Sequence, residues 1–239
     1  MDSTIVTYSL QNGIATITMD DKDKNLISPA MIKAVSIAFK QAKKDKAVVV
    51  LTGRDSIFSA GFDLKILKTG ALNTYNMLMG GFKLAYQLLS YPYPVVIACN
   101  GHAIAMGVFL LLSGDYRIGV SGDYKIVANE VAIGLILPYA AIEICRQRLV
   151  PAHFQRATLL SESYTPKTSV EAGFMDQVVP EEMLIPTAIE KAASYTQLNL
   201  KAHSKSKSRV RKRLLYKLQI AMLKDRIDFV LLGIKRLFS

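Results

Sequence analysis

A buried-strand pattern followed by a glycine turn and an apolar helix is the feature that most constrains this chain. Residues 94–99 read PVVIAC, which is typical of a strand buried on both faces. Asn100 and Gly101 tolerate positive φ and predict a turn. Residues 105–112 then have the pattern of an apolar helix that ends at Gly114. A strand, a turn and a helix start in this order direct free backbone N–H groups toward one point.

A single acidic residue, Glu130, follows within an apolar neighbourhood that spans residues 126–133. Backbone donors at a helix start together with an isolated carboxylate predict an oxyanion site with a nearby base. Burial would raise the pKa of this carboxyl group, which suits a base that works near neutral pH. The alternative is a structural carboxylate that accepts a hydrogen bond from a nearby amide.

Length and composition predict one large domain with a sizeable core, because the 239 residues are 51% hydrophobic and 21% charged. Cys99 and Cys145 are too few for a disulfide scaffold, and we interpret both as buried thiols in a reducing compartment. No signal-peptide pattern is present, and the longest apolar stretch, residues 103–112, is shorter than the roughly 20 residues that cross a bilayer. We therefore expect a cytoplasmic protein without membrane insertion.

The first fifty residues predict a ββα unit. Residues 4–10 and 14–19 flank a Gln-Asn-Gly turn and predict a β-hairpin. Ser28 and Pro29 predict the start of a helix, and residues 47–53 predict a buried strand. The expected apolar face of that helix comprises Met31, Val35, Ala38, Phe39 and Ala42.

The C-terminal segment carries most of the net charge of +11. Residues 201–239 contain twelve Lys and Arg residues against Asp225 and Asp228. Three uses are open: attraction of anionic small molecules, a solvated helix face, or nucleic-acid binding, for which no motif is present. Two apolar stripes predict two amphipathic helices that pack on the main domain or on a neighbouring subunit. The stripes are Leu214, Leu218, Ala221 and Met222, and then Ile227, Val230, Leu231, Ile234 and Phe238.

Five segments form an ordered set of motifs. Residues 58–65 read FSAGFDLK and residues 94–107 read PVVIACNGHAIAMG. Residues 115–118 read DYRI, residues 129–134 NEVAIG and residues 171–182 EAGFMDQVVPEE. Together they resemble the crotonase superfamily, which contains the enoyl-CoA hydratases and isomerases, and the resemblance covers essentially the whole chain.

This resemblance implies an α/β fold built as a spiral of ββα units, followed by C-terminal helices that form trimers, often paired into hexamers. We expect residues 1–195 to form the crotonase-type core with the acyl-CoA site, and residues 196–239 to form a basic helical segment for trimer packing. The implied substrate is an acyl-CoA thioester. Coenzyme A enters only as part of the substrate, and we expect no separate cofactor, no metal and no nucleic-acid partner.

The resemblance also implies where the thioester oxygen is held. In the family it lies between two backbone N–H groups, which correspond here to the amides of Phe62 and Met106, with Glu130 as the base. Removing one such donor typically costs about 10²–10³ in rate. The residues that we assign to substrate binding are Ala60, Gly61, Asp63, Leu64, Lys65, Gly107, Phe109 and Leu135.

One departure from the family pattern bears on the reaction. Hydratases of the family use two glutamates, and the first of these positions is Phe109 here, which neither polarises water nor moves a proton. Glu130 alone suits a proton shuttle, as in a Δ3–Δ2 enoyl-CoA isomerase. The alternatives are a hydratase, thioester hydrolysis, decarboxylation, or a CoA-binding protein that has lost its activity.

Four residues keep a second interpretation. Asp63 is more often a cap for the helix that follows than a ligand, and Lys65 either meets a CoA phosphate or ribose or is solvated. A turn histidine such as His102 more often satisfies local backbone groups than acts in catalysis. Leu135 belongs either to the core or to the wall of an acyl pocket.

Overall fold

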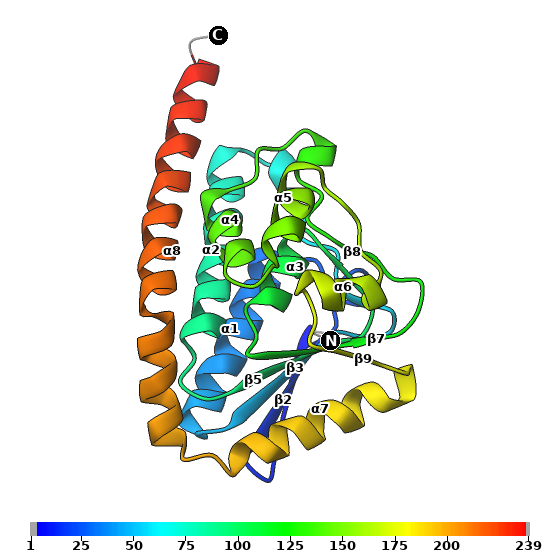
Figure 1. Cartoon of the computed structure of the whole chain (residues 1–239). Helices are drawn as coiled ribbons and strands as arrows, with labels where there is room; N and C mark the ends of the chain where they lie inside the picture. Colours follow the sequence, from blue (N-terminus) through cyan, green and yellow to red (C-terminus); the bar gives the residue numbers. More distant parts are fainter. Residues whose placement is uncertain (1–3, 238–239) are drawn as a thin grey trace.

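The computed structural model describes residues 4–237 and has two sheets surrounded by helices (Figure 1). The larger sheet has six strands in the order β1-β2-β3-β5-β7-β9, and the smaller has three in the order β4-β6-β8. The strands are β1 Val6–Gln11, β2 Ile14–Met19, β3 Val48–Thr52, β4 Ile57–Ser59, β5 Val95–Cys99, β6 His102–Ile104, β7 Tyr116–Val120, β8 Ile126–Val127 and β9 Gln177–Val179. Only β1 and β2 pair antiparallel, and every other pair of named strands is parallel.

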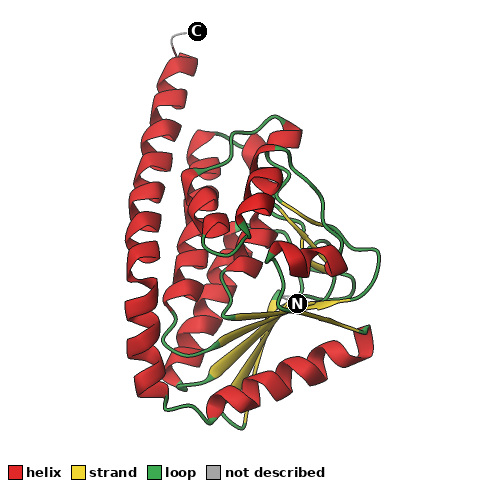
Figure 2. Ribbon diagram, viewed as in Figure 1, coloured by secondary structure: helices red, strands yellow, loops and turns green. Residues whose placement is uncertain are grey.

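The helices cover both faces of the larger sheet. The α-helices are α1 Pro29–Lys44, α2 Ala71–Ser90, α3 Met106–Leu112, α4 Tyr139–Arg146, α5 Pro151–Leu159, α6 Pro166–Ala172, α7 Glu181–Thr196 and α8 Leu200–Leu237, and two 3-10 turns are η1 Ile66–Lys68 and η2 Val131–Ile133. In Figure 2, α7 lies on one side of the six-stranded sheet and the other helices lie on the opposite side. Two separate apolar clusters result, one under α7 and a larger one among the remaining helices.

Successive chain segments give one strand to each sheet, which confirms the predicted spiral of ββα units. β3 joins the larger sheet and β4 the smaller one, and the chain then enters α2. The next segment repeats this order with β5, β6 and α3, and the following one with β7 and β8. Because β4, β6 and β8 are parallel neighbours, the loops that follow them leave the same edge of the small sheet.

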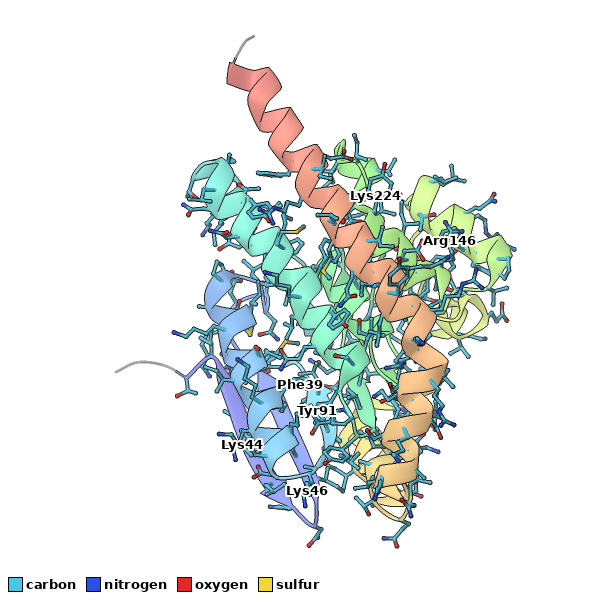
Figure 3. All side chains as sticks on the ribbon, turned by 90° about the vertical axis from the view of Figure 1, so that its left-hand side faces the viewer. Phe39, Lys44, Lys46, Tyr91, Arg146 and Lys224 are labelled. Carbon is cyan, nitrogen blue, oxygen red and sulfur yellow. The ribbon has the colours of Figure 1, made fainter. Side chains whose placement is uncertain are left out.

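The predicted N-terminal elements are confirmed in detail. Asn12 and Gly13 both have positive φ, at 50° and 76°, as expected of the tight turn between β1 and β2. Ser28 caps α1, with its side chain accepting a hydrogen bond from Met31 N at 3.2 Å. The buried face of α1 consists of the predicted residues, Met31, Val35, Ala38, Phe39 and Ala42. From this face Phe39 packs edge to face on Tyr91, 5.4 Å between ring centroids (Figure 3).

The prediction of two C-terminal amphipathic helices is wrong, because residues 200–237 form the single helix α8. No proline interrupts this stretch, so nothing forces the backbone to break between the two apolar stripes. Leu218 and Ala221 of the first stripe are buried, whereas Ile227 of the second is 50% exposed. The side chains from residue 230 onward lie outside the described set.

Helix α8 runs along the outside of α2 and α4 (Figure 3). Near its middle, the ammonium group of Lys224 lies 5.3 Å from the ring centroid of Tyr139, at the start of α4. Within residues 4–237, no helix has the length and the low charge that crossing a bilayer requires.

Gly101 holds the turn between β5 and β6 against the loop before β4. A Cβ at this position would lie 1.7 Å from the carbonyl oxygen of Ser56. The same oxygen accepts a hydrogen bond from His102 N at 2.9 Å, so it cannot move away without losing that bond. We expect Gly101→Ala to lower the free energy of unfolding by about 3 kcal/mol, measured by urea denaturation.

The matched control is Gly80→Ala in α2, where the new methyl group would meet only side-chain atoms of Ile32, at 3.3 Å and 3.5 Å. There the gain in helix propensity should leave the free energy of unfolding unchanged or slightly raised. Equal effects of the two substitutions would contradict the packing described for Gly101.

Candidate active site

Three backbone segments meet at one edge of the small sheet. Ser59 at the end of β4 pairs with Ala103, and Ile104 at the end of β6 pairs with Val127 at the end of β8. Phe62 follows β4 by three residues, Met106 follows β6 by two, and Glu130 follows β8 by three. The parallel register therefore brings the three residues proposed for catalysis to the same edge.

The loop that carries Phe62 is held by hydrogen bonds on both of its sides. The Ser59 hydroxyl donates to the Asn25 carbonyl at 2.7 Å and accepts from Gly61 N at 3.2 Å. The Gly61 carbonyl accepts from Ile27 N at 2.8 Å. The Phe62 N–H, by contrast, donates to no residue in the described part of the chain. The loop is thus rigid, but its next amide is free.

The start of α3 leaves a second amide free. Ala105 has φ 50° and donates its N–H to the Val127 carbonyl at 2.9 Å. Its own carbonyl accepts the first helical bonds, from Val108 N and Phe109 N. Met106 N–H precedes these donors and finds no acceptor among residues 4–237. An unsatisfied N–H at a helix start is available to a ligand.

Glycine at position 61 brings the two free amides together. A Cβ on Gly61 would lie 2.9 Å from Ala105 Cβ and 3.4 Å from Met106 N, and the φ of Gly61 is +91°. No residue with a side chain fits this conformation and this contact without strain. Gly107 makes a comparable contact, since its Cβ would lie 2.4 Å from the Ser59 carbonyl oxygen. These two glycines pack the end of β4 against the start of α3.

Glu130 is buried and unpaired. Glu130 is 8% exposed, and its Oε2 atom has no hydrogen-bond partner in the described part of the chain. Burial raises the pKa of the Glu130 carboxyl group from 4.5 to about 7. The backbone at this position is fixed, because the Glu130 carbonyl accepts from Ile133 N at 3.2 Å and from Leu135 N at 2.8 Å. The local arrangement thus holds a carboxylate ready to exchange a proton near neutral pH.

An aromatic wall lies beside the free amides. The rings of Phe62 and Phe82 meet edge to face at 6.4 Å, and those of Phe82 and Phe109 stack at 6.1 Å. A Cβ on Gly81 in α2 would lie 2.6 Å from the Phe62 ring, so glycine makes room for that ring. Phe109 is 1% exposed. Phe109 therefore fills its place in α3 with a tightly packed ring that carries no proton-transfer group.

The other residues assigned to substrate binding surround this edge. Leu64 and Lys65 are exposed, and the Asp63 carboxylate accepts a hydrogen bond from Lys65 N at 2.9 Å, just before η1. Ala60 is half-buried and Leu135 is 45% exposed. His102 is the first residue of β6, at the other end of this strand from Ile104, and its Nδ1 accepts a hydrogen bond from Lys125 N at 2.9 Å. Within residues 4–237, no group of His, Cys, Asp and Glu side chains is arranged to hold a metal ion.

Sequence reasoning missed one residue that fixes the Glu130 loop. Asp225 of α8 accepts hydrogen bonds from Tyr139 N at 2.8 Å and from Ala140 N at 3.0 Å. It thereby caps α4, the helix that follows the loop of residues 130–138. No local sequence pattern predicts this contact, because 86 residues separate Asp225 from Tyr139.

Known proteins share this architecture. The chain matches the family model described as enoyl-CoA hydratase/isomerase over residues 9–228. Human mitochondrial enoyl-CoA delta isomerase 1 is 27% identical over 208 residues, which are 84% of this chain and 68% of that protein. An enoyl-CoA isomerase from Mycobacterium tuberculosis, solved in its apo form, is 43% identical with a TM-score of 0.90, over 94% of this chain and 98% of that one.

A second structure of the same Mycobacterium tuberculosis protein describes it as the probable enoyl-CoA hydratase EchA3, and is again 43% identical, with a TM-score of 0.93 over 98% of this chain and 100% of that one. One and the same relative therefore carries names for both reactions. The family is nevertheless unambiguous, since its model spans most of the chain and the fold matches over nearly its full length. This chain belongs to the enoyl-CoA hydratase/isomerase family.

Proposed function

We propose that this protein is an acyl-CoA enzyme that moves a double bond from position 3 to position 2 of an enoyl-CoA thioester. The observation that carries the proposal is the pairing of one buried, unpartnered carboxylate, Glu130, with two free backbone amides, those of Phe62 and Met106. Family membership supports the substrate class, and the names of several relatives include enoyl-CoA isomerase.

In the proposed reaction the thioester oxygen accepts hydrogen bonds from Phe62 N and Met106 N. Glu130 takes the proton from C2, and the resulting negative charge spreads onto that oxygen. The two amides stabilise this charge without any reorientation, an effect worth about 10²–10³ in rate for each donor. Protonated Glu130 then returns the proton to C4, which leaves the double bond between C2 and C3. One carboxyl group that alternates between base and acid is sufficient.

Phe109 favours this reaction over hydration. Adding water requires a group that orients the water molecule, and a buried phenyl ring stacked on Phe82 offers none. Hydration is the second candidate, because relatives described as enoyl-CoA hydratases are equally similar to this chain. Leu64 and Lys65 are exposed beside the amide of Phe62 and suit the coenzyme A portion of the substrate.

The oligomeric state is part of the proposal. We infer that the protein assembles as a homotrimer or a hexamer and that the segment 196–239 takes part in the assembly. Exposed apolar side chains follow Glu130 in the loop before α4, and an assembly would cover such a surface. They are Val131, Ile133, Leu135 and Ile136.

Substrate choice and one substitution test the reaction. Purified protein given trans-3-enoyl-CoA should form trans-2-enoyl-CoA, and given trans-2-enoyl-CoA it should form no 3-hydroxyacyl-CoA. Glu130→Gln should lower kcat about 10²–10⁴-fold while KM changes little, because only the proton transfer is lost. Product analysis by chromatography and initial rates measure both effects.

Glu190→Gln, which changes an exposed carboxylate of α7, is the matched control and should keep full activity. Hydroxyacyl product would establish hydration instead, and release of free CoA would establish hydrolysis. Affinity for acyl-CoA without any turnover would identify a binding protein.

The raised pKa of Glu130 predicts a pH dependence of the rate. Below about pH 7 the carboxyl group is protonated and cannot act as the base, so kcat should fall about tenfold per pH unit and level off above pH 7. A profile of kcat from pH 5 to 9 measures this. A plateau that extends down to pH 5 would contradict the role of Glu130.

Stability should depend on pH through the same group. The folded pKa of about 7 exceeds the unfolded value of 4.5, so folding favours the protonated form. The contribution of Glu130 to stability is fully present below about pH 4.5 and is lost as the pH rises through 7, by about 3 kcal/mol in total. Urea denaturation of wild type and Glu130→Gln from pH 5 to 8 should show the variant gaining relative stability as the pH rises. A constant difference would show that Glu130 is not buried in an apolar environment.

A further inference from the structure

A second site lies at the other end of α3 from the candidate active site. Met106 begins α3, and Asp115 follows the last residue of this helix, Leu112, by three positions. Asp115 lines a cavity of about 470 Å³ between the first half of α8 and the end of α4. The seven residues of α3 separate the two sites by about 10 Å at 1.5 Å per residue. Its lining also includes Gln147, Arg148, His203, Lys207 and Arg211.

The charges in this cavity do not balance. Lys207 Nζ lies 2.6 Å from one oxygen of Asp115, and Arg211 lies 2.8 Å from the other. Both cations are buried, at 9% and 7% exposure. Arg148 is a third cation, and its guanidinium donates only to the Gly114 carbonyl, at 2.7 Å. Three cations thus share one carboxylate.

Donors without partners also gather here. In the described part of the chain, Gln147 Nε2, Arg148 Nε and His203 Nε2 are shielded from solvent and make no hydrogen bond. They come from the end of α4 and from α8, and all three residues line the same cavity. A buried donor left unpaired costs about 1–3 kcal/mol, so such atoms normally have a partner. Their concentration at one place indicates a missing acceptor.

Burial and the positive charge around the cavity lower the pKa of two of its titratable groups. Burial, and next the charges of Arg117 and Arg211, lower the pKa of Arg148 to about 10. Burial and the nearby Lys207 lower the pKa of His203. Water in the cavity would leave this positive charge uncompensated, whereas an anion would offset it.

We propose that this cavity binds a phosphate group, either inorganic phosphate or the phosphate of a small monoester. A tetrahedral phosphate offers several strong acceptor oxygens in different directions, and the donors approach from two helices. A carboxylate has only two oxygens and can accept hydrogen bonds from fewer of these donors. The bound group would tie α8 to the end of α4 and so stabilise the folded protein by mass action. This site does not depend on the function proposed above.

Calorimetric titration of the intact protein tests the proposal, with inorganic phosphate and glycerol 3-phosphate as separate probes at constant ionic strength. The test variants are Gln147→Met and His203→Phe. Each removes one free donor and no hydrogen bond to the protein, so the fold should survive, as thermal melting in phosphate-free buffer will show. Lys212→Met, which changes an exposed cation of the same helix, is the matched control.

We expect the protein to bind at least one of the two probes, with one molecule per chain. The Tm of the protein should rise when that probe is present. Each test variant should weaken the Kd about tenfold, while Lys212→Met should change it less than twofold. Absence of saturable binding would overturn the proposal, whether water fills the cavity or a neighbouring subunit covers it. Unchanged affinity in both test variants, or equally tight binding of acetate, would overturn it as well.

Discussion

The contact between the loop after β4 and the start of α3 is the constraint on which the candidate site depends, because it brings together two backbone N–H groups that have no acceptor among residues 4–237. Gly61 and Gly107 let the loop after β4 touch the start of α3, and so bring the amide of Phe62 close to that of Met106. Gly61 N donates to the Ser59 hydroxyl and Ile27 N donates to the Gly61 carbonyl, which fixes this loop, and the bond from Ala105 N to the Val127 carbonyl fixes the helix start. Because peptide groups provide the donors, the neighbouring side chains are free to be apolar and to shape the surrounding pocket.

The burial of Glu130 follows from the same framework. The small sheet brings the end of β8 level with the end of β6, and Glu130 Oε2 is buried there without a hydrogen-bond partner in the described part of the chain. Such burial costs folding free energy when the group is ionised, which is the usual trade between stability and activity at a functional site. Helix α8 helps to hold the arrangement, since Asp225 caps the helix that follows the Glu130 loop.

Much of the fold could be predicted from local sequence patterns. The hairpin around Asn12 and Gly13, the cap at Ser28 and the buried face of α1 all follow from short-range rules, and the structure confirms each of them. The strand, turn and helix start of residues 94–112 also pointed to free amides at the start of α3, whereas the amide of Phe62 was expected only from the resemblance to the crotonase superfamily. Expectations for the substrate contacts of Asp63, Leu64 and Lys65 stay predictions.

What sequence reasoning missed depends on contacts between distant residues. The continuity of α8 comes from docking on α2 and α4, and the apolar spacing alone suggested a break that does not exist. Asp225 caps a helix that starts 86 residues before it in the sequence. The ion pairs of Asp115 with Lys207 and Arg211 likewise join residues that are 92 and 96 positions apart. The basic residues of the C-terminal segment looked alike in sequence, yet Lys207 and Arg211 are buried while Lys212 is exposed.

The most direct measurement is a crystal structure of the protein with butyryl-CoA, a saturated thioester that has no double bond to move. We predict that the thioester oxygen lies about 2.7–3.1 Å from both Phe62 N and Met106 N, with the Glu130 carboxylate facing C2. A thioester oxygen bonded to neither amide, or a Glu130 side chain turned into solvent, would contradict the proposed site.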